Sequence, residues 1–161
     1  MNFTENMNEI LKQEAELVFE SFTMEEAYAL GTLLYTKAKE HTLPVAIDIT
    51  RSGQQLYHAA LPGAIPDNDR WIERKIRLVN RFYHSSFYIY NLLESLNTTL
   101  EDQYFISSND YAARGGSFPI FIKGCGMVGT VTVSGLPQEE DHKFVVTVIK
   151  EFLENGKNVK A

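Results

Sequence analysis

The sequence lacks several features that define large classes of proteins. A single cysteine among 161 residues excludes an intrachain disulfide and a cysteine-rich zinc site. Its longest apolar runs, such as residues 43–47, are far shorter than the roughly 20 apolar residues that a membrane-spanning helix needs, which excludes such a helix. No charged and then apolar leader follows Met1, so we expect a cytoplasmic protein.

Basic residues are in the minority. The chain has 15 Lys and Arg against 21 Asp and Glu, a formal net charge of -6, and such a field repels nucleic acid and anionic membrane surfaces. We therefore expect no nucleic-acid partner and no membrane partner. The remaining composition, 44% hydrophobic and 12% aromatic, is that of an ordinary globular protein. The length predicts a single domain over residues 1–161, without internal repeats or linkers.

Helical and strand patterns alternate along the chain. Apolar residues recur at helical spacing up to Val18, and Thr23 with Glu26 has the capping-box pattern that starts a second helix. Turns at Gly53 and at residues 124–126 separate apolar runs that indicate two β-hairpins. Three further helices are expected, at about 67–82, from 85 or 86 to about 97, and from 139 to a C-cap at Gly156. Two hairpins among helices predict an α+β fold with an antiparallel sheet.

The second hairpin carries the most specific pattern. It reads Gly115-Gly116-x-x-Pro119, then Gly129-x-x-x-Val133-Ser134-Gly135, then Asp141 at a helix start. In this order, and with Asp48 and Gly53 in the first hairpin, it resembles the haem-degrading (HbpS/GlcG-like) domain family over residues 22–153. Residues 1–21 would then be an N-terminal helical extension. The run Trp71 to Lys75 is most similar to a cytoplasmic branch of that family whose function the resemblance does not fix.

The resemblance implies a profilin-like or GlcG-like antiparallel β-sheet flanked by helices, and it implies a homo-oligomer. It also implies haem as a possible cofactor, since members of the family bind haem and some degrade it. Whether the chain is an enzyme stays open, because no compact acid-base, nucleophile or metal constellation is visible in the sequence. No metal site is predicted.

A row of arginines is the first candidate binding site. Arg70, Arg74, Arg77 and Arg81 fall at i, i+4, i+7 and i+11 of an expected helix and share one face, with Lys75 nearby. Guanidinium groups suit carboxylate and phosphate oxygens. One hypothesis is that part of this stripe binds an anionic ligand, such as tetrapyrrole propionates or a small carboxylate. The alternative is a solvated helix face or salt bridges between subunits.

Arg114 and two histidines are further candidates. Arg114 precedes two glycines and could clamp a carboxylate, or it could simply belong to a tight turn. His142 is the first candidate for an axial haem ligand and His84 the second. The simpler interpretation is that His142 lies on the surface and that Asp141 caps a helix.

Two other residues invite structural interpretations. Cys125, between Gly124 and Gly126, is interpreted as a turn residue, because no base adjoins it in sequence to activate a thiolate. Asp48 alternates with Val45, Ile47 and Ile49, so we expect it to face away from the core and to cap the Gly53 turn.

Two functions remain in view. In the first, the protein binds a small anionic ligand, haem or a related compound, through Arg74, Lys75, Arg77, Arg114 and His142. In the second, it is a non-catalytic homo-oligomeric scaffold that binds protein partners, and the apolar stripe of the N-terminal helix is the oligomerisation element. Convergence of the cations on one cleft favours the first function, and dispersal favours the second.

Overall fold

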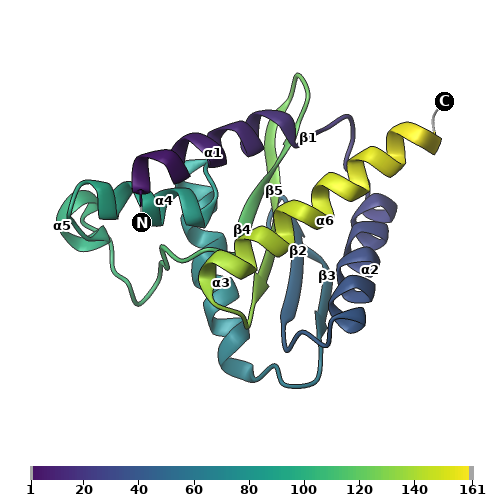
Figure 1. Ribbon diagram of the computed structural model, residues 1–161, viewed down its shortest axis with the longest axis horizontal. Helices are drawn as coiled ribbons and strands as arrows, with labels where there is room; N and C mark the ends of the chain where they lie inside the picture. Colours follow the sequence, from purple (N-terminus) through teal and green to yellow (C-terminus); the bar gives the residue numbers. More distant parts are fainter. Residues whose placement is uncertain (1, 160–161) are drawn as a thin grey trace.

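The computed structural model describes residues 2–159. The chain folds into one five-stranded sheet with helices on both faces (Figure 1). The elements in chain order are α1 (Phe3–Glu16), β1 (Val18–Phe19), α2 (Met24–Glu40), β2 (Ala46–Arg51), β3 (Gln54–Ala60), α3 (Pro66–Phe82), α4 (Ser86–Ser95), α5 (Leu100–Tyr104), β4 (Ser117–Ile122), β5 (Gly126–Ser134) and α6 (Gln138–Val159). The two predicted hairpins, β2–β3 and β4–β5, are confirmed, as is the α+β class.

The sheet is mixed rather than wholly antiparallel, which corrects the sequence-based prediction. Its strand order is β1-β4-β5-β2-β3, and β1 pairs with β4 in parallel while the other pairs are antiparallel. A strand of two residues is too short to leave an alternating pattern in the sequence. Pro119 lies within β4. Because β1 pairs only with Phe121 and Ile122 of that strand, Pro119 has a neighbouring strand, β5, on one side only. A proline, which has no N–H to donate, is tolerated at such a position.

The layers follow from the alternation of side chains along the strands. In β2, Ile47 and Ile49 face α2 and α6, and they join a core that includes Leu34, Phe118 and Ile149. The helix α3 covers the opposite face, against β5, β4 and β2 (Figure 1). The residues that these strands turn toward α3 are largely small and polar, and they are buried: Asp48, Ser117, Thr130, Thr132 and Ser134.

The N-terminal segment packs into its own chain. The helix α1 lies against α4 (Figure 1), Ile10 is buried, and Asn6 donates a hydrogen bond from Nδ2 to Asn91 Oδ1 at 3.0 Å. The same segment supplies β1 and the buried Phe19. Part of the apolar stripe that suggested an oligomerisation helix, including Ile10 and Leu17, is therefore buried within the chain, whereas Leu11 stays 40% exposed.

The helix termini show what local signals decide. The capping box is confirmed, because Thr23 Oγ1 accepts from the Glu26 N–H at 3.0 Å and Glu26 Oε1 accepts from the Thr23 N–H at 3.3 Å. The predicted C-cap at Gly156 is wrong, because α6 continues to Val159. One glycine costs a helix only about 1 kcal/mol, too little to end it. Within residues 2–159, no helix is both long enough and apolar enough to cross a membrane.

Candidate functional site

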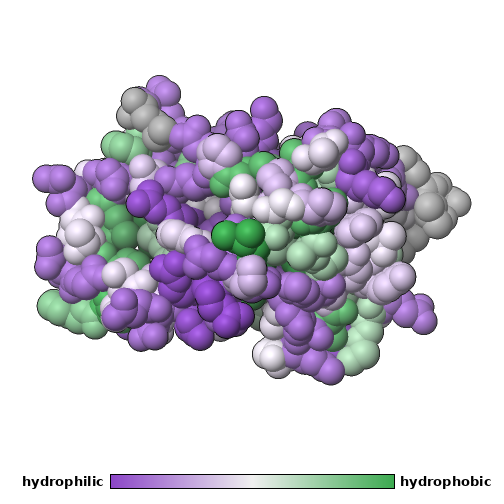
Figure 2. All heavy atoms as spheres, turned by 90° about the horizontal axis from the view of Figure 1, so that it is seen from below, coloured by the Kyte–Doolittle hydropathy of each residue, from purple (hydrophilic) through white to green (hydrophobic). Residues whose placement is uncertain are grey.

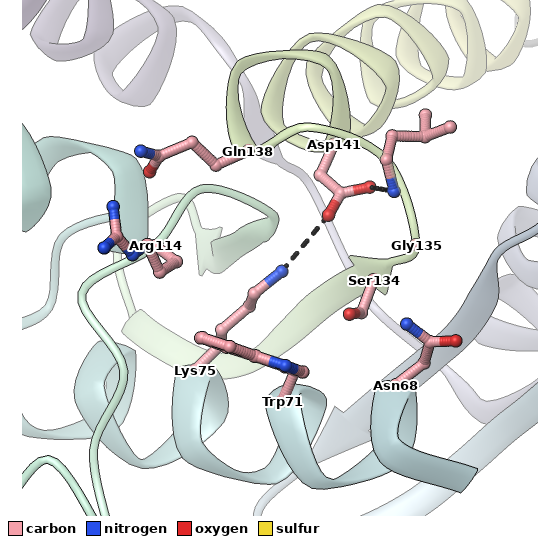
Figure 3. Close-up of a pocket in the computed structure, with 9 residues that line it drawn as sticks. Asn68, Trp71, Lys75, Arg114, Ser134, Gly135, Gln138 and Asp141 are labelled. Carbon is pink, nitrogen blue, oxygen red and sulfur yellow. Dashed lines mark hydrogen bonds and ion pairs between the residues drawn. The ribbon is translucent and has the colours of Figure 1, made fainter. Parts of the chain in front are cut away.

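A cavity of about 260 Å³ opens between α3, the turn after β5 and the start of α6 (Figure 3). Its floor and walls combine two cations, one carboxylate, one indole and several small polar groups. The lining residues are Asn68, Trp71, Lys75, Arg114, Ser134, Gly135, Leu136, Gln138 and Asp141.

Lys75 is placed by the apolar face of α3. It follows Ile72 by three residues and precedes Leu78 and Val79 by three and four, and all three neighbours are buried. The lysine side chain is only 3% exposed. Its Nζ donates to Val133 O at 3.1 Å and lies 3.3 Å from Asp141 Oδ2 (Figure 3). A buried ammonium group must be paired and hydrogen-bonded. Lys75 finds both partners at the end of β5 and the start of α6.

Asp141 is the partner, in the first turn of α6. Its Oδ1 accepts a hydrogen bond from the Leu136 N–H at 3.0 Å, so the carboxylate ties the turn before α6 as well as Lys75. The interpretation of Asp141 as a simple helix cap is corrected here, since the residue is 2% exposed and one of its carboxylate oxygens binds Lys75 of α3.

Burial shifts both groups of this pair. Desolvation raises the pKa of Asp141 to about 6, although the ammonium of Lys75 opposes that rise. Desolvation lowers the pKa of Lys75 from its ordinary value, and the charge of Asp141 opposes that fall. Shifts that bring an acid and an amine toward neutral pH are typical of functional sites.

Gly116 makes room for the pair. Its φ of +135° is one that L side chains rarely adopt, and an added Cβ would lie 2.7 Å from Lys75 Nζ and would collide with Val133 O. The glycine motif of the sequence thus has a physical reason at this position, because only glycine lets the backbone pass this close to the ammonium.

Arg114 lies at the left of the cavity in the view of Figure 3, beside Gln138. It is exposed, and its Cζ lies 5.3 Å from the centre of the Tyr90 ring. Among residues 2–159 it forms no salt bridge. The next residue, Gly115, donates its N–H to Gln138 Oε1 at 3.1 Å, which holds this loop against α6.

The arginine stripe does not converge on the cavity. Arg74 lies over the Trp71 ring, 4.1 Å from its centre, and donates to Ser108 O at 3.3 Å. Arg77 donates to Asp110 O at 3.1 Å. Both guanidinium groups therefore hold the loop that follows α5. Lys75, predicted to lie near this stripe, instead points into the fold.

His142 is buried, which corrects the expectation of a surface histidine. Its Nε2 lies 2.8 Å from Gln13 Oε1 in α1, and the rings of Phe87 and Phe118 flank it. Desolvation lowers its pKa to about 4. The residue does not line the cavity.

The other histidine candidate has a carboxylate partner. His84 Nδ1 lies 2.8 Å from Glu14 Oε1, and its ring stacks on Tyr88.

Cys125 is exposed in the β4–β5 turn, as interpreted. Asp48 does face away from the main core. It does not cap the Gly53 turn, because it accepts from Thr50 Oγ1 and Gln55 Nε2, both at 2.6 Å, beneath α3. Over the described residues, no group of three or more His, Cys, Asp or Glu is placed to hold a metal ion.

Sequence reasoning missed Asp141, Trp71 and Gln138 as members of the site. Lys75 was among the predicted ligand-binding residues, and a lysine on the apolar face of a helix needs a buried counter-charge. Nothing in the sequence identified which of the 21 Asp and Glu would supply it.

Comparisons with known proteins agree with this fold. A family model described as haem degrading protein HbpS-like matches residues 22–150. A UPF0303 protein of Streptomyces coelicolor is 51% identical over 145 residues, covering 90% of this chain and 92% of the relative. A UPF0303 protein of Serratia proteamaculans is 41% identical over 153 residues, covering 95% of each.

Solved structures give the same result. The crystal structure of Ybr137w protein is 34% identical, with a TM-score of 0.86 over 93% of this chain and 88% of that one. The crystal structure of a PduOC:heme complex shares the fold at 16% identity, with a TM-score of 0.67 over 81% of this chain and 94% of that one. By sequence and by fold, the chain belongs to the HbpS-like family of haem-degrading proteins, together with the UPF0303 proteins.

Proposed function

We propose that the cavity binds a small anionic ligand, with Arg114 as the group that holds its carboxylate. One observation carries the proposal: the cavity has two cations and one anion, and Lys75 and Asp141 neutralise each other. Arg114 is left as a cation at the cavity, in a chain with a net charge of -6. A planar guanidinium is suited to two parallel hydrogen bonds with a carboxylate.

The size and donors of the cavity favour a compact ligand over an enclosed haem. Its volume of about 260 Å³ lies just below the range of about 300–1,000 Å³ typical of sites for drug-sized molecules. No histidine, cysteine, methionine or tyrosine is among its lining residues, and those are the usual axial ligands of haem iron. The cavity residues therefore do not fit haem as an enclosed group.

Replacing Arg114 with Ala is expected to weaken binding of pyruvate or succinate by about 10–100-fold, because a hydrogen bond to a charged group contributes about 1.5–3 kcal/mol. Isothermal titration calorimetry measures this effect. Arg70→Ala is the matched control, since Arg70 is an exposed arginine of α3 that pairs with Glu73 and does not line the cavity. Equal affinity of wild type and Arg114→Ala would contradict the proposal, as would haemin displacing pyruvate from the wild-type protein.

The second candidate function is a homo-oligomeric scaffold for protein partners. It is supported by large apolar side chains left on the surface, above all Tyr28 at 66% and Phe105 at 89% exposed. The strand β3 also forms an open edge of the sheet, and such edges pair readily with other chains. On the face seen in Figure 2, hydrophobic residues form separate groups within a hydrophilic surface.

Multi-angle light scattering tests this candidate. We expect the wild-type protein to have a mass of two or more subunits of 18.3 kDa each. Tyr28→Glu should lower this mass, because a charge buried in an interface without a partner is costly. If the wild-type protein is a monomer at micromolar concentration, the scaffold function is contradicted, because it requires a homo-oligomer.

A further inference from the structure

Lys75 has the environment of a reactive amine. It lines the cavity, its side chain is 3% exposed, and its nearest charged partner is a single carboxylate at 3.3 Å. Two acceptors, Val133 O and Asp141 Oδ2, take two of the three hydrogens that an ammonium can donate. Loss of one proton would therefore leave the nitrogen with both of these hydrogen bonds and with a free lone pair.

Stability alone is a weak reason for such a pair. Replacing a buried ion pair with well-packed apolar residues is often neutral or stabilising. The burial of Lys75 lowers its pKa, and desolvation of this kind is one way in which proteins activate a lysine as a nucleophile. The pair stands at the wall of a cavity that also contains a cation able to hold a carboxylate. These groups together suit a ligand with both a carboxylate and a carbonyl.

We propose that Lys75 forms an imine with the carbonyl carbon of a small oxo acid whose carboxylate is held by Arg114. This inference rests on the proposed function and adds the class of ligand and the bond that forms. Asp141 acts as the proton carrier, since its Oδ2 already faces Lys75 Nζ.

The lone pair of neutral Lys75 Nζ forms a C–N bond, and the C=O π electrons move to the oxygen. Asp141 carries one proton from the nitrogen to that oxygen, which gives a carbinolamine. A second proton, taken up from solvent through Asp141, lets the hydroxyl group leave as water, and the nitrogen lone pair completes a C=N bond. One amine, one carbonyl and one proton become one iminium ion and one water.

Reductive trapping tests this inference. The full-length wild-type protein is incubated with pyruvate and cyanoborohydride, which reduces an iminium ion to a stable secondary amine, and the adduct is located by peptide mass mapping. We expect the adduct at Lys75 in preference to the exposed Lys143, because Lys75 shares the cavity with Arg114 and its burial favours the neutral amine. Lys143→Met should keep the adduct and Lys75→Met should lose it. If Lys75→Met does not fold, the peptide mass map of the wild-type protein still shows whether the adduct is on Lys75.

The outcomes separate this inference from the proposed function. Calorimetric binding of pyruvate without an adduct at Lys75 would overturn the imine and leave anion binding intact. Adducts spread over exposed lysines would also overturn it. Succinate, which has carboxylates and no ketone, should compete with pyruvate and slow the trapping without forming an adduct itself.

Discussion

Asp141→Asn is expected to lower the free energy of unfolding by about 3–5 kcal/mol at pH 7, because it leaves the Lys75 ammonium buried without a counter-charge. The substitution keeps the size of the side chain and the oxygen that accepts from the Leu136 N–H, so the lost charge is the main change. Lys75 can relieve the penalty by releasing its proton, and the loss of stability should therefore be smaller at pH 10 than at pH 7. Urea unfolding at both pH values measures the effect.

Two variants control for this prediction. Glu140→Gln removes a carboxylate from the same helix turn, but Glu140 is exposed, so its effect should stay within about 0.5 kcal/mol. The double variant Lys75→Met with Asp141→Leu should recover much of the lost stability, because neither charge is then left alone. A double variant no more stable than Asp141→Asn would mean that packing, rather than charge, dominates at this site.

The second large effect is a pH dependence caused by His142. Burial lowers its pKa in the folded protein to about 4, against about 6.5 for an unperturbed histidine. The unfolded chain therefore binds a proton between these values and the folded chain does not, so the contribution of His142 to stability is present above about pH 6.5 and is lost as the pH falls toward 4. The stability of wild type relative to His142→Gln should fall by about 3 kcal/mol between pH 7 and pH 4.

Comparison with a variant is necessary because a neighbour titrates in the opposite sense. The raised pKa of Asp141 means that its protonation stabilises the fold as the pH falls, and this contribution is common to wild type and His142→Gln. His41 is exposed, and His41→Gln should leave the pH dependence unchanged. A constant difference between wild type and His142→Gln from pH 7 to pH 4 would show that the histidine is not held neutral in the folded protein.

Local patterns in the sequence were enough to predict the helices and strands that depend on residues close together in the chain. The hairpins follow from alternation and turn residues, and the start of α2 follows from the Thr23–Glu26 capping box. The glycine order of the second hairpin indicated the family. The two-residue β1 was missed because it exists only through its pairing with β4.

The site could not be found in the same way, because its pairs are remote in sequence. Helical spacing gathered the arginines correctly on one face, but two of them bind the carbonyls of a loop more than 30 positions away. His142 was taken for a surface residue because nothing adjacent in sequence reveals that α1 and α4 will cover it.

By itself, the sequence determined the α+β class, the two hairpins, most of the helices and the family, since each depends on periodicity, turns or glycines close together in the chain. The tertiary structure alone decided that Lys75 and Arg114 share a cavity while Arg74, Arg77 and His142 lie elsewhere. Lys75 meets Val133 and Asp141 across 58 and 66 positions of the chain. A residue's neighbours in sequence set the face of the helix on which it lies, and packing between distant elements sets which charge it meets there.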